Sequence, residues 1–129
     1  MPSLFTKIIQ RELPGHIVAE DEHCIAFLDI NPNAKGHTLC VPKKEVDRIF
    51  DLDEKTYNHL MQFSRKVAHA LKKSVDCKRI GMAVVGLEVP HVHVHLIPLN
   101  KMSEMTFQEK VQLSNEEFQQ LTETIKSNL

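Results

Sequence analysis

The sequence predicts a single α+β domain built from an antiparallel sheet, one long central helix and a C-terminal helix. Short apolar segments bounded by turn residues indicate strands. Residues 54–75 repeat apolar side chains at helical spacing, which indicates a long amphipathic helix. A chain of 129 residues with 42% hydrophobic content is long enough to bury one core.

The first half of the chain alternates predicted elements with short turns. Ser3 to Arg11 predicts a short amphipathic helix. Residues 17–19 and 24–28 predict two strands joined by an acidic turn. The composition of residues 31–36 indicates a loop, and residues 37–41 predict the strand that follows it.

The second half begins with the clearest helix, from about Glu54 to Val75. Its predicted apolar stripe consists of Tyr57, Leu60, Met61, Ser64, Val67, Ala68, Leu71 and Val75. Residues 79–85 predict another strand, and a polar connection leads to a last helix. We expect that helix to begin at Ser114, because Ser114 and Glu117 have the spacing of a capping box.

The composition excludes several classes of partner. Sixteen basic and seventeen acidic residues give a net charge of −1, so no global field attracts nucleic acid or a membrane. No segment predicts a membrane span or a signal peptide. The three cysteines, Cys24, Cys40 and Cys77, are widely spaced, which is typical of free thiols in a reducing compartment. We therefore expect a cytoplasmic protein without nucleic-acid or membrane partners.

Residues 91–98, His-Val-His-Val-His-Leu-Ile-Pro, are the most informative segment for function. Their period of two predicts a strand with His91, His93 and His95 on one face and neighbouring rings about 6.5–7 Å apart. Three interpretations are open: a solvent-exposed strand face, a metal site built from the three imidazoles, and a nucleophilic histidine with helper histidines. The third is chemically sound, because a neutral imidazole is a competent nucleophile once its tautomer is fixed.

Residues 91–97 resemble the histidine-triad signature, in which three histidines alternate with apolar residues, and which names the HIT family. Three further blocks resemble that family and occur in its order. Residues 4–9 resemble its opening helix, residues 26–32 its nucleoside-binding strand and turn, and residues 36–43 the strand that carries its fourth histidine. The resemblance therefore covers about three-quarters of the chain, residues 3–98.

The resemblance implies a five-stranded antiparallel sheet, and a dimer in which two such sheets continue as one. It implies one domain over residues 1–129, whose core is residues 3–98 and whose C-terminal extension, residues 100–129, carries a helix. The residues themselves also favour a homodimer, since unpaired sheet edges and apolar helix stripes need cover. We expect that interface to use the 54–75 helix and the 79–85 strand.

Members of the family hydrolyse or transfer nucleoside monophosphates attached through phosphoramidate, phosphoanhydride or similar bonds. The resemblance thus implies a nucleotide hydrolase or transferase acting on a phosphoramidate or a dinucleoside polyphosphate. By position in the motif, His93 would attack the α-phosphorus and form a nucleotidyl-histidine intermediate that water hydrolyses. His95 would contact the phosphate and leaving group, while His91 and His37 would orient the strand and the nucleophile. The resemblance calls for no cofactor and no metal.

The same resemblance implies a nucleoside pocket. Asp29 matches the residue that accepts hydrogen bonds from the ribose hydroxyls. The residues that match the apolar walls of the pocket are Leu4, Phe5, Ile8, Phe27, Leu28 and Ile30. From the residues alone, Asp29 is equally typical of a turn before Asn-Pro, and phenylalanines are more often core residues.

The loop before the triad departs from the family pattern. It is shorter, and Glu88 stands where the family has a phosphate-binding serine. A carboxylate beside phosphate oxygens is unfavourable by roughly 1 kcal/mol at about 4 Å. Either Glu88 points away and only the Val89 amide binds phosphate, or Glu88 binds an amine-bearing leaving group, or the substrate differs.

A second departure concerns zinc, which some bacterial relatives hold with a Cys-x-x-Cys pair in the opening helix. The matching residues are Ser3 and Thr6, which are not plausible zinc ligands, so we expect no structural metal. Two other functions stay open. One is a metal-binding protein or metal-dependent hydrolase that uses His91, His93 and His95. The other is a nucleotide-binding regulatory protein with feeble turnover.

Overall fold

A five-stranded antiparallel sheet forms the centre of the computed structural model, which describes residues 2–129. The spatial order of its strands is β1-β2-β3-β5-β4. The strands are β1 (Ile17–Glu20), β2 (Cys24–Leu28), β3 (Thr38–Pro42), β4 (Arg79–Ala83) and β5 (Val94–Leu99). This architecture confirms the predicted α+β class.

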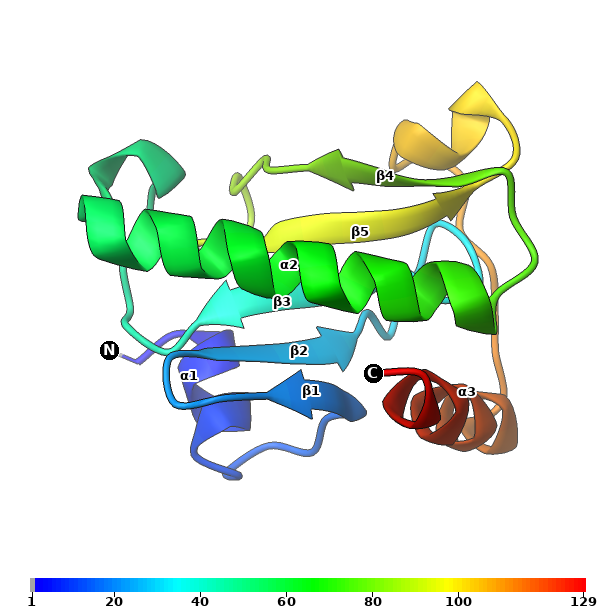
Figure 1. Ribbon diagram of the computed structural model, residues 1–129, viewed down its shortest axis with the longest axis horizontal. Helices are drawn as coiled ribbons and strands as arrows, with labels where there is room; N and C mark the ends of the chain where they lie inside the picture. Colours follow the sequence, from blue (N-terminus) through cyan, green and yellow to red (C-terminus); the bar gives the residue numbers. More distant parts are fainter. Residues whose placement is uncertain (1) are drawn as a thin grey trace.

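Helices cover both faces of the sheet (Figure 1). The long helix α2 (Glu54–Ser74) crosses one face, and α3 (Asn115–Ser127) packs beside it against β1. The short helix α1 (Leu4–Ile9) packs on the opposite face. Two 3₁₀ turns, η1 (Ile49–Asp51) and η2 (Met102–Met105), lie in the connections. Within residues 2–129, no helix is long and apolar enough to cross a membrane.

Local capping explains where the two longer helices begin. The Asp53 side chain accepts a hydrogen bond from the backbone N–H of Thr56, and α2 follows. The predicted capping box of α3 is confirmed, because Ser114 and Glu117 each bond the backbone of the other. The three cysteines are buried free thiols, as expected.

The alternation of side chains along β2 divides the interior into two layers. The larger layer lies between the sheet and α2 with α3, and includes Cys24, Ala26 and Leu28. The smaller layer lies between the sheet and α1, and includes Ile25 and Phe27. The candidate site is built on the α1 side.

The apolar stripe of α2 is rotated from the predicted one. Phe63 and Ala70 are buried, whereas Tyr57 and Val75 are only half-buried. The stripe packs on the sheet of its own chain, so it gives no independent support for a dimer. Strand β4 is an edge strand, and the homodimer through this edge stays a prediction.

The histidine row is not one continuous strand, contrary to prediction. β4 ends at Ala83 and β5 begins only at Val94. The His91 N–H donates to the Val89 carbonyl, and the tight turn that this closes interrupts strand pairing. Pro90, in the middle of the turn, has no N–H with which to pair to a neighbouring strand. The His93 and His95 ring centroids are 4.9 Å apart, closer than the rise of an ideal strand gives.

Candidate active site

His93 is held in a single tautomer by its own backbone. Its Nδ1 lies 2.8 Å from the carbonyl oxygen of His91. Since a carbonyl only accepts, Nδ1 carries a proton, and in the neutral form of the ring the Nε2 lone pair is free. The ring stands edge-on to Phe5, with centroids 4.9 Å apart, and lines a cavity of about 540 Å³. His93 thus presents an unprotonated nitrogen to the cavity.

The His37–His95 pair orients the next imidazole. The backbone N–H of Asn33 donates to His37 Nδ1 at 3.0 Å, which leaves the proton of neutral His37 on Nε2. His37 Nε2 donates that proton to His95 Nδ1 at 2.9 Å. His95 therefore carries its own proton on Nε2, where it is a donor in a cavity that the His95 ring lines.

Burial keeps both rings of this pair neutral. Burial lowers the pKa of His37 to about 3 and that of His95 to about 4. Just before His37, Gly36 has a φ of +97°, a conformation that residues with a side chain rarely adopt. An added Cβ at Gly36 would lie 2.9 Å from a methyl group of Val75.

Asp29 closes a turn and also lines the cavity. One carboxylate oxygen accepts the backbone N–H of Asn31 at 2.8 Å, which closes the predicted turn. The other lies 3.6 Å from His37 Nε2, and the side chain lines the cavity. Burial raises the pKa of Asp29. Its second oxygen is available to a ligand.

The proposed apolar walls divide into three groups. Phe5, Ile8 and Phe27 are buried together in the layer between α1 and the sheet. Leu4 and Ile30 are 51% and 77% exposed, which is unusual for large apolar side chains. Leu28 was expected with them, but the structure places it on the opposite face, because side chains alternate along β2.

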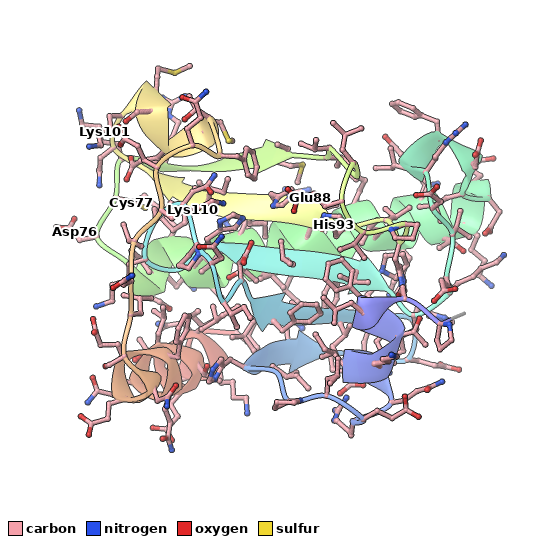
Figure 2. The ribbon with its side chains drawn as sticks, turned by 180° about the vertical axis from the view of Figure 1, so that it is seen from behind. Asp76, Cys77, Glu88, His93, Lys101 and Lys110 are labelled. Atoms are coloured by element: carbon pink, nitrogen blue, oxygen red, sulfur yellow. The ribbon has the colours of Figure 1, made fainter. Side chains whose placement is uncertain are left out.

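Glu88 lines the cavity together with His93, so it does not point away from the site (Figure 2). Val89, the other loop residue expected to bind phosphate, packs its side chain against the α1 layer. The Glu88 side chain therefore adds a carboxyl group to the cavity wall.

His91 is tied to the opening helix by a network that sequence reasoning missed. His91 Nε2 donates to the Pro42 carbonyl at 2.7 Å, and Nδ1 accepts the Ser3 hydroxyl at 2.7 Å. Glu45 accepts the Ser3 N–H and the Thr6 hydroxyl, both at 2.6 Å. These hydrogen bonds, led by that of Thr6, lower the pKa of Glu45 to about 2. Ser3 and Thr6 thus hold α1 against the triad.

Two sets of side chains in the described chain bring possible metal ligands within 4.8 Å of one another. Neither is the set of His91, His93 and His95 that the metal hypothesis requires. The first set consists of Asp29, His37 and His95. Its two facing ring nitrogens, His37 Nε2 and His95 Nδ1, are 2.9 Å apart and hydrogen-bonded. Tetrahedral zinc would need these nitrogens about 3.3 Å apart.

The second set joins Asp21 and Cys24, at the turn between β1 and β2, with His59 of α2. Asp21 and His59 already pair at 2.8 Å. Burial raises the pKa of the Cys24 thiol to about 12, which disfavours the thiolate that binds metals.

Comparisons with known proteins match the chain to HIT domains. The HIT domain family model matches residues 10–102. An uncharacterized HIT-like protein of Methanocaldococcus jannaschii is 42% identical over 99 residues, covering 74% of this chain and 77% of that protein. The adenosine 5′-monophosphoramidase of Saccharomyces cerevisiae is 34% identical over 96 residues, covering 74% of this chain and 61% of that enzyme.

The fold agrees as well. The crystal structure of a HIT-like protein from Bartonella henselae, described as involved in cell-cycle regulation, matches with a TM-score of 0.86 and 30% identity. The match covers 98% of this chain and 96% of that one. With its histidine row, its sheet and its relatives in agreement, the chain belongs to the histidine-triad (HIT) family.

Proposed function

We propose that this protein is a nucleotide hydrolase or transferase that releases a nucleoside monophosphate from a phosphoramidate or a dinucleoside polyphosphate. One observation carries the proposal. The hydrogen bond from His93 Nδ1 to the His91 carbonyl leaves Nε2 as an unprotonated nucleophile in the cavity. The yeast relative named as a monophosphoramidase supports the same reaction class.

The arrangement supports a two-step transfer. His93 Nε2 attacks the α-phosphorus, the bond to the leaving group breaks, and the leaving group takes a proton from solvent. Positive charge that develops on the ring is stabilised at Nδ1–H by the His91 carbonyl. Negative charge on the phosphoryl oxygens is met by His95 Nε2–H. Water then attacks the same phosphorus and releases a proton to solvent, and the bond to His93 breaks, which returns the lone pair to Nε2.

A panel of substrates with product analysis tests this function. Adenosine 5′-phosphoramidate and diadenosine tetraphosphate are incubated with the protein, with and without EDTA. We expect AMP as a product and the same rate in both buffers, because the proposed chemistry needs no metal. Activity that disappears with EDTA and returns with zinc contradicts the proposal and favours a metal-dependent hydrolase. Tight binding without turnover favours a regulatory protein.

Replacing Asp29 with alanine should weaken nucleoside recognition. The free carboxylate oxygen of Asp29 faces the cavity, and hydrogen bonds from ribose hydroxyls to a carboxylate contribute about 1.5–3 kcal/mol. We therefore expect KM to rise about tenfold or more. Steady-state kinetics check the change, with a 2′,3′-dideoxy substrate as the matched control. The wild-type protein should disfavour that substrate, and Asp29→Ala should not distinguish it from the ribonucleotide.

A further inference from the structure

The connector between η2 and α3 forms part of the cavity wall. Thr106, Phe107 and Lys110 line the cavity together with Asp29 and His93. All three connector residues lie beyond residue 102, where the match to the family model ends. This part of the wall therefore lies outside the region that the family model matches.

The connector is fastened to the loop before β3 rather than lying free. Lys110 Nζ donates to the Asn33 side-chain oxygen at 2.7 Å, and the Asn33 amide donates to the Glu104 carbonyl at 2.9 Å. The Val111 N–H donates to the Pro32 carbonyl at 3.0 Å. Asn33 also donates its backbone N–H to His37, so the same residue holds both the connector and the His37–His95 pair.

Phe107 packs against the imidazole rings of His37 and His95 in a backbone conformation that is unfavourable for a non-glycine residue. Its φ is +63°, a left-handed conformation that non-glycine residues seldom adopt. Its ring meets the His95 ring edge-on, with centroids 4.8 Å apart, and lies 6.1 Å from the His37 ring. The Lys110 ammonium lies over the Phe107 ring, 5.2 Å from the centroid.

The charge of Lys110 acts on the Asp29 carboxyl from beyond salt-bridge distance, where it partly offsets the burial that raises the pKa of Asp29. Among residues 2–129, Lys110 is the only lysine or arginine that lines the cavity, and none of their carboxylates forms a salt bridge with it. Its hydrogen-bond acceptor is a neutral amide oxygen. A fixed ammonium with neutral partners at the edge of a cavity is suited to an anionic ligand.

Position decides which anionic group it meets. A phosphate over His93 is already served by His95 Nε2–H, whereas Lys110 lies beyond His95, over Phe107. Figure 2 shows Glu88 beside His93 and Lys110 farther along the sheet. A chain of phosphates that extends toward Lys110 therefore also moves away from the carboxyl group of Glu88.

We propose that the connector adds a second-phosphate subsite, in which Lys110 binds the phosphate that follows the one facing His93. The site thereby selects nucleotides with two or more phosphates over those with one. This inference rests on the proposed nucleotide function and narrows its substrate class to nucleoside polyphosphates.

Binding of ADP and AMP to the intact protein tests the subsite without any need for turnover. Calorimetric titrations in metal-free buffer compare the wild-type protein with Lys110→Gln. Lys101→Gln is the matched control, because Lys101 is exposed near η2 and does not line the cavity. We expect the wild-type protein to bind ADP about tenfold more tightly than AMP. Lys110→Gln should lose this preference with its AMP affinity unchanged, and Lys101→Gln should keep it.

Two outcomes overturn the subsite: a Lys110→Gln protein that still prefers ADP, or one that loses AMP and ADP affinity equally. The second would place Lys110 on the first phosphate. An ADP preference that depends on Lys110, in a protein that turns over no nucleotide, would support the subsite and contradict the enzymatic proposal. Nucleotide turnover together with an ADP preference that does not depend on Lys110 would support the enzymatic proposal and contradict the subsite.

Discussion

Replacing His93 with alanine should abolish nucleotide turnover, with kcat falling about a thousandfold or more. The variant removes the nitrogen that forms the covalent bond, and no other described side chain places an unprotonated imidazole nitrogen against the same phosphate. The fold should persist, because the His93 ring lies at the cavity rather than under α2. Steady-state kinetics measure the loss, and thermal unfolding by circular dichroism verifies the fold.

Two further variants separate attack from support. His95→Ala removes a donor to the phosphoryl oxygens, and we expect a smaller loss in kcat of about a hundredfold. His69→Ala is the matched control, since His69 is exposed on α2, and it should turn over at the wild-type rate.

The covalent step has a direct signature. Rapid acid quench of the wild-type protein during turnover, followed by peptide mass spectrometry, should find a nucleoside monophosphate on the peptide that contains His93. The His95→Ala protein should carry the same adduct on the same residue. An adduct on another residue, or a His93→Ala protein with wild-type kcat, would show that His93 is not the nucleophile.

Acid should destabilise the fold well before the carboxylates that bind backbone groups are protonated. His37 and His95 have pKa values of about 3 and about 4 in the folded protein, against about 6.5 when unfolded. Below that value the unfolded chain binds protons that the native protein does not. Stability is then fully present above about pH 6.5 and falls toward pH 4, by about 1.4 kcal/mol per pH unit for each histidine.

Other groups set the range in which this effect is measured. Burial also lowers the pKa of His91, which adds to the loss of stability. Burial raises the pKa of Asp29, which acts in the opposite direction as the pH falls. Glu45 and Asp53 have pKa values of about 2 in the folded protein, so their stabilising effect is lost only at lower pH. Urea unfolding between pH 7.5 and pH 5 therefore reports mainly on the buried histidines.

The variant His37→Asn isolates one contributor. Asparagine retains an acceptor for the Asn33 N–H but does not titrate, so the free energy of unfolding should fall less steeply with decreasing pH. His69→Asn is the exposed control and should follow the wild-type profile. Equal slopes in all three proteins would show that His37 is protonated in the folded state.

Local patterns were sufficient to predict most elements of this fold. The capping box at Ser114 located the start of α3, and short apolar segments located β2 and β3. The alternation in residues 91–97 placed Val92, Val94 and Leu96 under α2 and left the histidines on the other face. Such features depend on neighbours in the chain, where caps, turns and the period of burial are encoded.

The tertiary structure decided which distant residues meet. Ser3 and His91, 88 residues apart, are joined by one hydrogen bond, and Lys110 reaches Asn33 across 77 residues. No local pattern distinguishes Ser3, Asn33 or Lys110 from ordinary surface side chains.

The same holds for the details of the site. Leu28 matched a family wall by sequence, but the face of β2 on which it lies is set by pairing with β3. The triad row was expected to be a full strand, but only its second half reaches the ladder with β3. The sequence therefore determined the chemistry available at the site, through the identity and spacing of its histidines. Long-range hydrogen bonds determined the tautomers of His37, His91 and His95, and sheet register determined the wall that each ring faces, because both form only when distant segments pack together.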